Sequence, residues 1–252
     1  IHFIRRAVDR VLAIFPFEKN IYEKESIPVS YVGHPLADIL ADCPAQAVVR
    51  NALGIAGDAP VFALLPGSRV SELQAMASLF VATAKLVRDA VPQARFITPL
   101  VNRETRAIFE AALRREPGVS IQLLDGKSHD ALAAADVVLV ASGTATLETA
   151  LLKRPMVITY RMPRLSAWLM KRRGYLPYVG LPNILAGEFV VPELLQDAAT
   201  PQALSRALID LFHDEPRRLR ISERFTHLLL DLKQNTAQKA ADAIMPYLEK
   251  TP

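Results

Sequence analysis

Between residues 61 and 160 the chain repeats one pattern, in which a short apolar run leads through a brief turn into a helical stretch. The predicted strands are Val61–Leu65, Ala94–Leu100, Val119–Leu124, Val137–Val140 and Met156–Tyr160. The predicted helices are Glu72–Asp89, Glu104–Arg115, His129–Ala134 and Ala145–Lys153. Strands that alternate with helices across short connections favour a doubly wound parallel sheet. We therefore predict a Rossmann-like α/β fold for this part of the chain.

The opening of the chain predicts a small βαβ piece. Strands are expected at Val8–Phe15 and Val29–Gly33, with a helix at Phe17–Glu25 between them. Leu36–Leu53 is a partly helical, alanine-rich linker. Because the chain begins at Ile1 rather than at Met, this opening piece is expected to be the tail of a domain that precedes it.

The closing part predicts helices. Two are expected at Glu188–Leu195 and Pro201–Phe212, and residues 213–252 form a charged helical region divided near Gln234–Asn235. The expected domains are therefore residues 1–40, 41–212 and 213–252. The last part would cross back to the first domain or be exchanged with a second subunit in a homodimer.

Composition excludes several classes of protein. A single cysteine, Cys43, excludes an internal disulfide, and five histidines stand without metal-ligand spacing. We expect no metal and no cofactor. A net charge of +4 favours anionic partners such as phosphates or acidic lipid and is too small to indicate nucleic acid. No apolar run approaches the roughly 18 residues of a membrane span, so we expect a cytoplasmic protein.

Residues 133–155 contain the first candidate site. The predicted strand Val137–Val140 opens through Ser142, Gly143 and Thr144 into a helix that Pro155 ends. A helix start offers free backbone N–H groups and the positive end of a dipole, which together favour a phosphate. Glu148 follows about one helical turn later and has the chemistry to accept hydrogen bonds from a ribose diol. The alternative is that Ser142 or Thr144 caps the helix and Glu148 faces water.

A second elbow, at Leu64–Glu72, has the same form. The strand Val61–Leu65 opens through Gly67 and Ser68 into a helix, and Arg69 adds forked donors suited to phosphate oxygens. Both elbows should lie at the carboxyl edge of one sheet, where open α/β folds bind ligands. Two elbows and an arginine suit a diphosphate, although Gly67 alone could serve the turn and Arg69 a surface pair.

Motifs of other enzyme classes are absent from the sequence. It has no GxxxxGK[ST] loop, no GxGxxG and no HExxH or GxSxG segment. These absences count against an ATPase, a dinucleotide dehydrogenase and the hydrolases that those motifs mark.

Two further candidates lie between residues 160 and 187. Asn183, in LPNILAG, is an amide among apolar neighbours that would bond a ligand or hold a loop. Trp168 stands beside a basic cluster of Lys171, Arg172 and Arg173, a combination that suits an anionic membrane surface as well as a core helix with solvated ends.

Several of these segments, in this order and at these separations, closely resemble the lipid-A-disaccharide synthase family. They are FPFEK at residues 15–19, VGHPLAD at 32–38, LLPGSRVSE at 64–72, PLVN at 99–102, ASGTATLE at 141–148, YRM at 160–162 and LPNILAG at 181–187. The resemblance runs from near Val8 to the final helices. The combination is specific, whereas each motif alone is not.

The resemblance implies an inverting glycosyltransferase of the B type, in which two Rossmann-like domains face each other and the C-terminal one binds UDP. It implies UDP-2,3-diacylglucosamine as donor, 2,3-diacylglucosamine 1-phosphate as acceptor, lipid A disaccharide 1-phosphate and UDP as products, and no metal. By position, Ser68, Arg69 and Ser142–Thr144 would meet the diphosphate, Glu148 would hold the ribose, and Asn183 would sit near the donor. The Trp168–Arg173 patch would contact the inner membrane or the acceptor phosphate.

The same resemblance places the general base in the preceding domain, so we expect this chain to bind UDP-sugar weakly and to be inactive alone. Two alternatives stay open. One is another UDP-sugar enzyme of the same architecture, such as a UDP-N-acetylglucosamine 2-epimerase or the transferase of the peptidoglycan lipid precursor. The other is a non-catalytic nucleotide-sugar-binding module.

Overall fold

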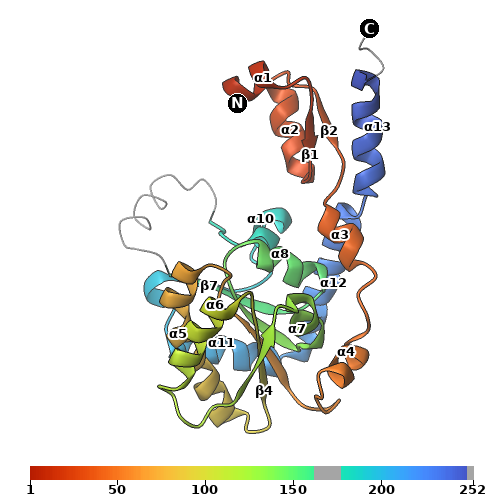
Figure 1. Cartoon of the computed structure of the whole chain (residues 1–252). Helices are drawn as coiled ribbons and strands as arrows, with labels where there is room; N and C mark the ends of the chain where they lie inside the picture. Colours follow the sequence, from red (N-terminus) through yellow and green to blue (C-terminus); the bar gives the residue numbers. More distant parts are fainter. Residues whose placement is uncertain (162–176, 249–252) are drawn as a thin grey trace. The chain divides into compact units, whose positions relative to one another are not determined.

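The computed structural model describes residues 1–161 and 177–248, and these fall into two compact units (Figure 1). The central unit is Pro44–Phe225, and the flanking unit combines Ile1–Cys43 with the chain from Thr226 onward. The chain therefore divides at 43/44 and 225/226, whereas the sequence suggested 40/41 and 212/213.

The central unit is built on a six-stranded sheet in the order β5-β4-β3-β6-β7-β8, in which every neighbouring pair is parallel. The strands are β3 (Val61–Leu65), β4 (Arg95–Leu100), β5 (Ile121–Asp125), β6 (Val137–Ala141), β7 (Met156–Tyr160) and β8 (Glu193–Leu195). The chain builds the sheet outward from β3 in one direction and then outward from β6 in the other. The predicted doubly wound parallel sheet is confirmed, with its switch point between β3 and β6.

Helices cover both faces of this sheet (Figure 1). They are α4 (Gln46–Ala52), α5 (Val70–Ala90), α6 (Arg103–Leu113), α7 (Ser128–Ala134), α8 (Thr144–Leu151), α10 (Leu181–Ala186), α11 (Pro201–His213) and the first part of α12 (Glu215–Leu232). Helix α5 packs against α6 and α11, and α4 packs against α7. Because both faces are covered, all five residues of β3 and of β6 are buried, which explains their unbroken apolar sequence.

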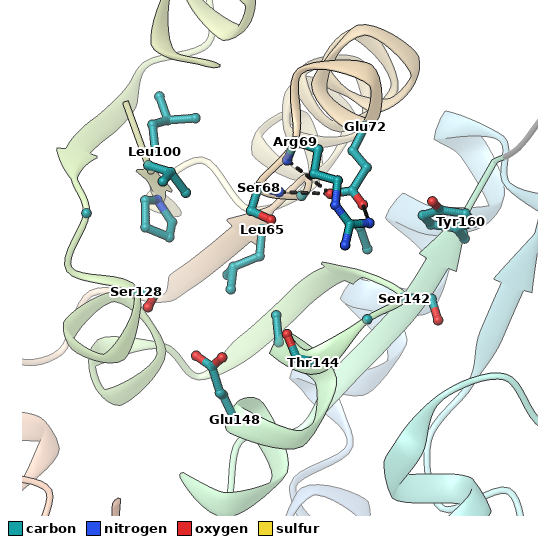
Figure 2. A pocket seen from close by; sticks show the side chains of 17 residues that line it. Leu65, Ser68, Arg69, Glu72, Leu100, Ser128, Ser142, Thr144, Glu148 and Tyr160 are labelled. Carbon is teal, nitrogen blue, oxygen red and sulfur yellow. Dashed lines mark hydrogen bonds and ion pairs between the residues drawn. The ribbon is translucent and has the colours of Figure 1, made fainter. Parts of the chain in front are cut away.

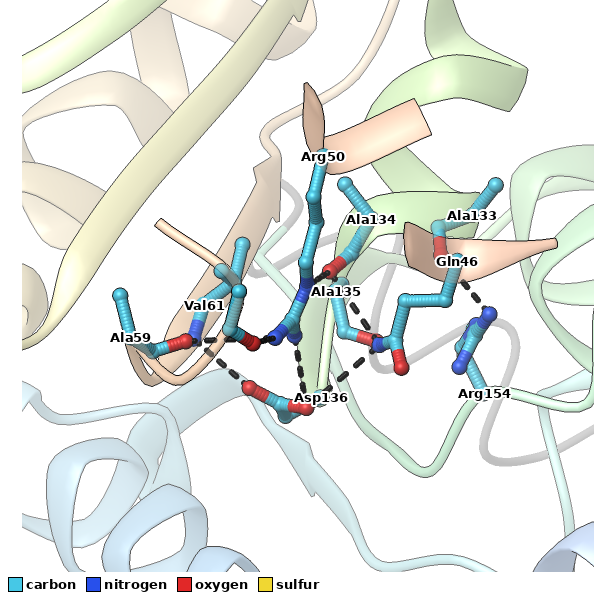
Figure 3. Close-up of polar contacts among 10 residues, drawn as sticks. Gln46, Arg50, Ala59, Val61, Ala133, Ala134, Ala135, Asp136 and Arg154 are labelled. Atoms are coloured by element: carbon cyan, nitrogen blue, oxygen red, sulfur yellow. Dashed lines mark hydrogen bonds and ion pairs between the residues drawn. The ribbon is translucent and has the colours of Figure 1, made fainter. Parts of the chain in front are cut away.

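A buried polar cluster ties the amino ends of β3 and β6 together (Figure 3). The Arg50 guanidinium donates to the carbonyls of Ala134 (2.9 Å) and Gly57 (2.8 Å) and lies 2.8 Å from Asp136 Oδ1. The other carboxylate oxygen of Asp136 accepts from the Val61 amide at 2.8 Å. Asp136 directly precedes β6 and Val61 begins β3, so the contacts of the buried Arg50 and the partly buried Asp136 fix the relative position of the two central strands.

The flanking unit contains a parallel pair, β1 (Val11–Ala13) and β2 (Val29–Tyr31), joined by α2 (Pro16–Lys24). This confirms the predicted opening βαβ piece. Its other helices are α1 (His2–Ala7), α3 (Pro35–Leu40), the end of α12 and α13 (Thr236–Leu248). The break between α12 and α13 falls at residues 233–235, where the sequence predicted it. Asp38 spans that break, since its carboxylate accepts from the amides of Asn235 (3.0 Å) and Thr236 (2.7 Å).

One local prediction is corrected. Glu188–Leu195 is not a helix, because Glu193–Leu195 forms β8 and pairs with the end of β7. The free edge of β7 and the preceding Pro192 override the helical preference of this short stretch. The LPNILAG segment, for which no helix or strand was predicted, is the helix α10, with Pro182 in its first turn and Gly187 in the left-handed conformation at its end.

Among the described helices, α5 alone is long and apolar enough to cross a membrane by length and composition. Half of that window is buried, and α5 packs between α6 and α11. Its apolar residues therefore belong to the core of the central unit.

Candidate functional site

The two predicted elbows meet at one pocket. They follow the adjacent strands β3 and β6, so the switch point of the sheet brings them side by side at the carboxyl edge. The pocket there has a volume of about 450 Å³, and Figure 2 shows the side chains that line it. Seven of the eight predicted donor-site residues line it: Gly67, Ser68, Arg69, Ser142, Gly143, Thr144 and Glu148.

In the β3–α5 elbow, the side chain of Glu72 occupies the helix start. One carboxylate oxygen accepts from the amides of Ser68 (2.9 Å) and Arg69 (3.2 Å), and the other lies 3.1 Å from the Arg69 guanidinium. Gly67 has a φ of +122°, and a Cβ added there would lie only 2.7 Å from the Cβ of Glu72. The glycine therefore serves this tight turn, and an internal carboxylate already fills the anion-binding donors of the elbow (Figure 2).

The β6–α8 elbow has no such carboxylate among the described residues. Gly143 precedes the helix at φ +158° and ψ −163°, a conformation that is essentially restricted to glycine, and a Cβ there would meet nothing within 4 Å. The Ser142 amide donates to the carbonyl of Thr159. Within the described part of the chain, the amides of Thr144 and Ala145 have no acceptor, as expected for the first turn of a helix. Neither Ser142 nor Thr144 caps α8 through its side chain.

Glu148 lies on α8, on the side of the pocket away from Arg69 (Figure 2). Its side chain is 18% exposed, and its Oε2 is 3.2 Å from Nε2 of His129 on α7. The carboxylate thus faces the pocket edge rather than open solvent, as the ribose interpretation requires.

Sequence reasoning missed several residues of this pocket. Glu72, Ser128 and Tyr160 line it, as do residues from the end of β4. Tyr160 and the end of β4 lie in segments that carried the family resemblance. Ser128 and the contact of His129 with Glu148 depend on how α7 lies against α8, and no local pattern in the sequence encodes that placement.

The structure does not bring Asn183 into this pocket. Its side chain is fully buried and exchanges hydrogen bonds with the backbone of Val191 (2.9 and 3.1 Å). It also donates to Glu193, whose carboxylate accepts the amides of Val179 and Gly180. In this conformation Asn183 fastens α10 to the start of β8 and has no exposed atom for a ligand. The Trp168, Lys171, Arg172 and Arg173 patch lies outside the described residues.

The fold and the pocket together define a class of protein. A Rossmann-like sheet of this order, with two elbows at its switch point, has the architecture of the C-terminal half of a B-type glycosyltransferase. Among solved structures of this fold, a UDP-GlcNAc 2-epimerase from Neisseria meningitidis bound to UDP-GlcNAc matches 99% of this chain and 64% of its own, with a TM-score of 0.66 and 13% identity. WaaG, a glycosyltransferase involved in lipopolysaccharide biosynthesis, matches 93% of this chain and 62% of its own, with a TM-score of 0.57 and 16% identity.

Sequence comparison gives the family. The model of LpxB, Lipid-A-disaccharide synthetase, matches residues 1–246. Lipid-A-disaccharide synthase from Dechloromonas aromatica is 56% identical over 97% of this chain and 65% of its own length. The lipid-A-disaccharide synthase from Aromatoleum aromaticum is 52% identical over 99% of this chain and 64% of its own length. The chain therefore belongs to the lipid-A-disaccharide synthase family, and it spans just under two thirds of the length of these relatives.

Proposed function

We propose that this chain is the UDP-binding part of a lipid-A-disaccharide synthase. The reaction would join UDP-2,3-diacylglucosamine to 2,3-diacylglucosamine 1-phosphate and release UDP and lipid A disaccharide 1-phosphate. The observation that carries the proposal is that residues of the β3–α5 and β6–α8 elbows line one pocket at the switch point of the sheet. Family membership supports it independently.

The pocket has the chemistry to stabilise a departing diphosphate. Negative charge grows on the β-phosphate as the bond to the sugar breaks, and donors that are already oriented lower the energy of that state. The free amides of Thr144 and Ala145 and the positive end of α8 supply such donors on one side. The Arg69 side chain, 80% exposed, supplies a positive charge on the other. Glu148 would accept the ribose hydroxyls.

A general base for the acceptor hydroxyl has no good candidate among the described residues of this pocket. Of its two lining carboxylates, Glu72 is held by the amides of the β3–α5 elbow, and Glu148 is the proposed ribose contact. An inverting transfer needs a base on the face of the sugar opposite the leaving group. We therefore propose that the chain binds UDP but does not catalyse transfer unaided.

Calorimetry and product analysis test this proposal. The chain should bind UDP more tightly than UMP, ADP or GDP, and it should form no disaccharide from the two acylated substrates. Absence of UDP binding would contradict the site, and disaccharide formation by the chain alone would contradict the assignment of the base. Formation of N-acetylmannosamine from UDP-N-acetylglucosamine would instead favour the epimerase alternative.

We also propose peripheral contact with the inner membrane from the cytoplasmic side, because both substrates carry acyl chains. The basic patch at Lys171, Arg172 and Arg173 beside Trp168 supplies charge and an aromatic anchor for anionic lipid. Replacing the three basic residues with serine should lower binding to anionic liposomes, and unchanged binding would contradict the patch as the contact. Light scattering would test the predicted homodimer.

A further inference from the structure

We propose that His129 is a positioning residue, which holds the Glu148 carboxylate in the orientation that receives the ribose. This rests on the proposed UDP site. The contact joins two helices, since His129 lies in the first turn of α7 and Glu148 in the second turn of α8. The His129 Nε2 to Glu148 Oε2 distance is 3.2 Å.

Glu148 depends on this contact for its orientation. A glutamate side chain has three rotatable bonds, and no other partner of the Glu148 carboxylate is found among the described residues. His129 engages Oε2 and leaves Oε1 for a ligand. The Glu148 side chain is 18% exposed and lines the pocket, whereas the His129 side chain is 41% exposed and is not among the lining residues.

The ligand class that this pair would favour is a ribonucleotide rather than a deoxynucleotide. A fixed carboxylate can accept hydrogen bonds from both hydroxyls of a ribose diol, and pre-orientation removes part of the entropy lost on binding. Immobilising one such side chain is worth roughly a two- to tenfold change in affinity. His129 would therefore act on nucleotide affinity only through the 2′- and 3′-hydroxyls.

A merely structural pair makes a different prediction. If His129 only ties α7 to α8, its loss should weaken the binding of every nucleotide equally and lower the melting temperature. The two roles therefore separate when the ribose hydroxyls are removed from the ligand rather than from the protein.

The experiment measures, by calorimetry, the affinities of UDP and of 2′,3′-dideoxyuridine 5′-diphosphate for the 252-residue chain and its variants. His129→Ala should weaken UDP roughly three- to tenfold and leave the dideoxy ligand unchanged within about twofold. His129→Gln, which keeps an N–H donor, should recover part of the loss. In a Glu148→Gln background, His129→Ala should add no more than about a twofold effect. His227→Ala, at an exposed histidine on α12 outside the pocket lining, is the matched control.

Each contrary result has its own meaning. Equal losses for both ligands, or unchanged UDP affinity in His129→Ala, would overturn the positioning role while leaving the UDP site intact. Absence of UDP binding in the unmodified chain, or unchanged UDP affinity in Glu148→Gln, would overturn the proposed site and this inference with it.

Discussion

The β3–α5 and β6–α8 elbows have the same strand-turn-helix form and differ in what occupies their amides. In the first, the Glu72 carboxylate fills the donors, and the space above Gly67 is taken. In the second, the amides of Thr144 and Ala145 are free within the described structure, and the space above Gly143 is open. The same strand-turn-helix form can therefore have amides that bond to a side chain of the chain itself, or amides that are free to bond to an anion. In the proposed UDP site, the β6–α8 elbow would therefore make the main phosphate contacts, and β3–α5 would contribute chiefly the Arg69 charge.

The most direct test of this difference is Gly143→Ala. A residue with a Cβ is strained at φ +158° and ψ −163°, which is worth about 1–3 kcal/mol, and relief of that strain would turn the amides away. UDP affinity should fall roughly tenfold to a hundredfold in calorimetry. Gly54→Ala is the control, because Gly54 also has a positive φ, of +69°, but does not line the pocket. Similar losses in both variants would show that general strain, not the elbow, is responsible.

Arg69→Met should have the next largest effect. The substitution removes one positive charge while keeping much of the side-chain length, and solvent screening limits the loss to about 1–1.5 kcal/mol. UDP affinity should therefore fall about five- to tenfold, with a smaller change for UMP, which lacks the β-phosphate. Arg206→Met, at an arginine that is 85% exposed on α11, gives the same change in net charge away from the pocket. An equal loss of UDP affinity in the two variants would mean that Arg69 acts only through long-range electrostatic attraction and does not contact the diphosphate.

Glu72→Gln should act in the opposite direction. It removes a negative charge from the pocket wall, keeps an oxygen to accept the elbow amides, and releases Arg69 from its ion pair. We expect UDP to bind about two- to fivefold more tightly, with a slightly lower melting temperature from the weaker helix cap. Glu104→Gln, in the first turn of α6, is the matched control. Weaker UDP binding would instead mean that the charge of Glu72 is needed to shape the elbow.

A substitution at Asp38 should have the smallest effect, because its carboxylate accepts from the amides at the start of α13 and does not line the pocket. Burial raises the pKa of this carboxyl, but hydrogen bonds from Thr236, Asn235 and Gln234 outweigh it and leave the pKa below its ordinary 3.8. The stabilisation is therefore present above pH 3.8 and is lost as pH falls through the lower pKa of the folded state. Asp38→Asn should lower the free energy of unfolding by about 0.5–1 kcal/mol at neutral pH and flatten its decline in acid, with UDP affinity unchanged. A change in UDP affinity would contradict the view of this carboxylate as a simple cap.

Much of the central fold was predictable because its signals are local. The apolar runs at β3 and β6 and the helical spacing of α5 identify a doubly wound sheet, and that fold dictates that the elbows share one edge. The grouping of Gly67 and Arg69 with Gly143 and Thr144 around one pocket follows from this topology alone.

Other features depend on contacts between distant segments. Strand β8 forms because β7 offers an open edge, which a helical prediction for Glu188–Leu195 could not take into account. The burial of Asn183 follows from the return of the chain at Val191. The contact of His129 with Glu148 needs the placement of α7 against α8. None of these three facts has a local signature.

The ion pair of Arg50 with the partly buried Asp136 also bears on the geometry of the proposed ligand site. It joins the amino ends of the two strands whose carboxyl ends carry the elbows, about 15 Å away for five-residue strands. Close-packed strands pass a shift at one end on to the other instead of absorbing it. The separation of the two turns therefore depends on contacts at the opposite end of the sheet. If the proposed UDP site is correct, a substitution at Arg50 would change nucleotide affinity although Arg50 does not contact the nucleotide.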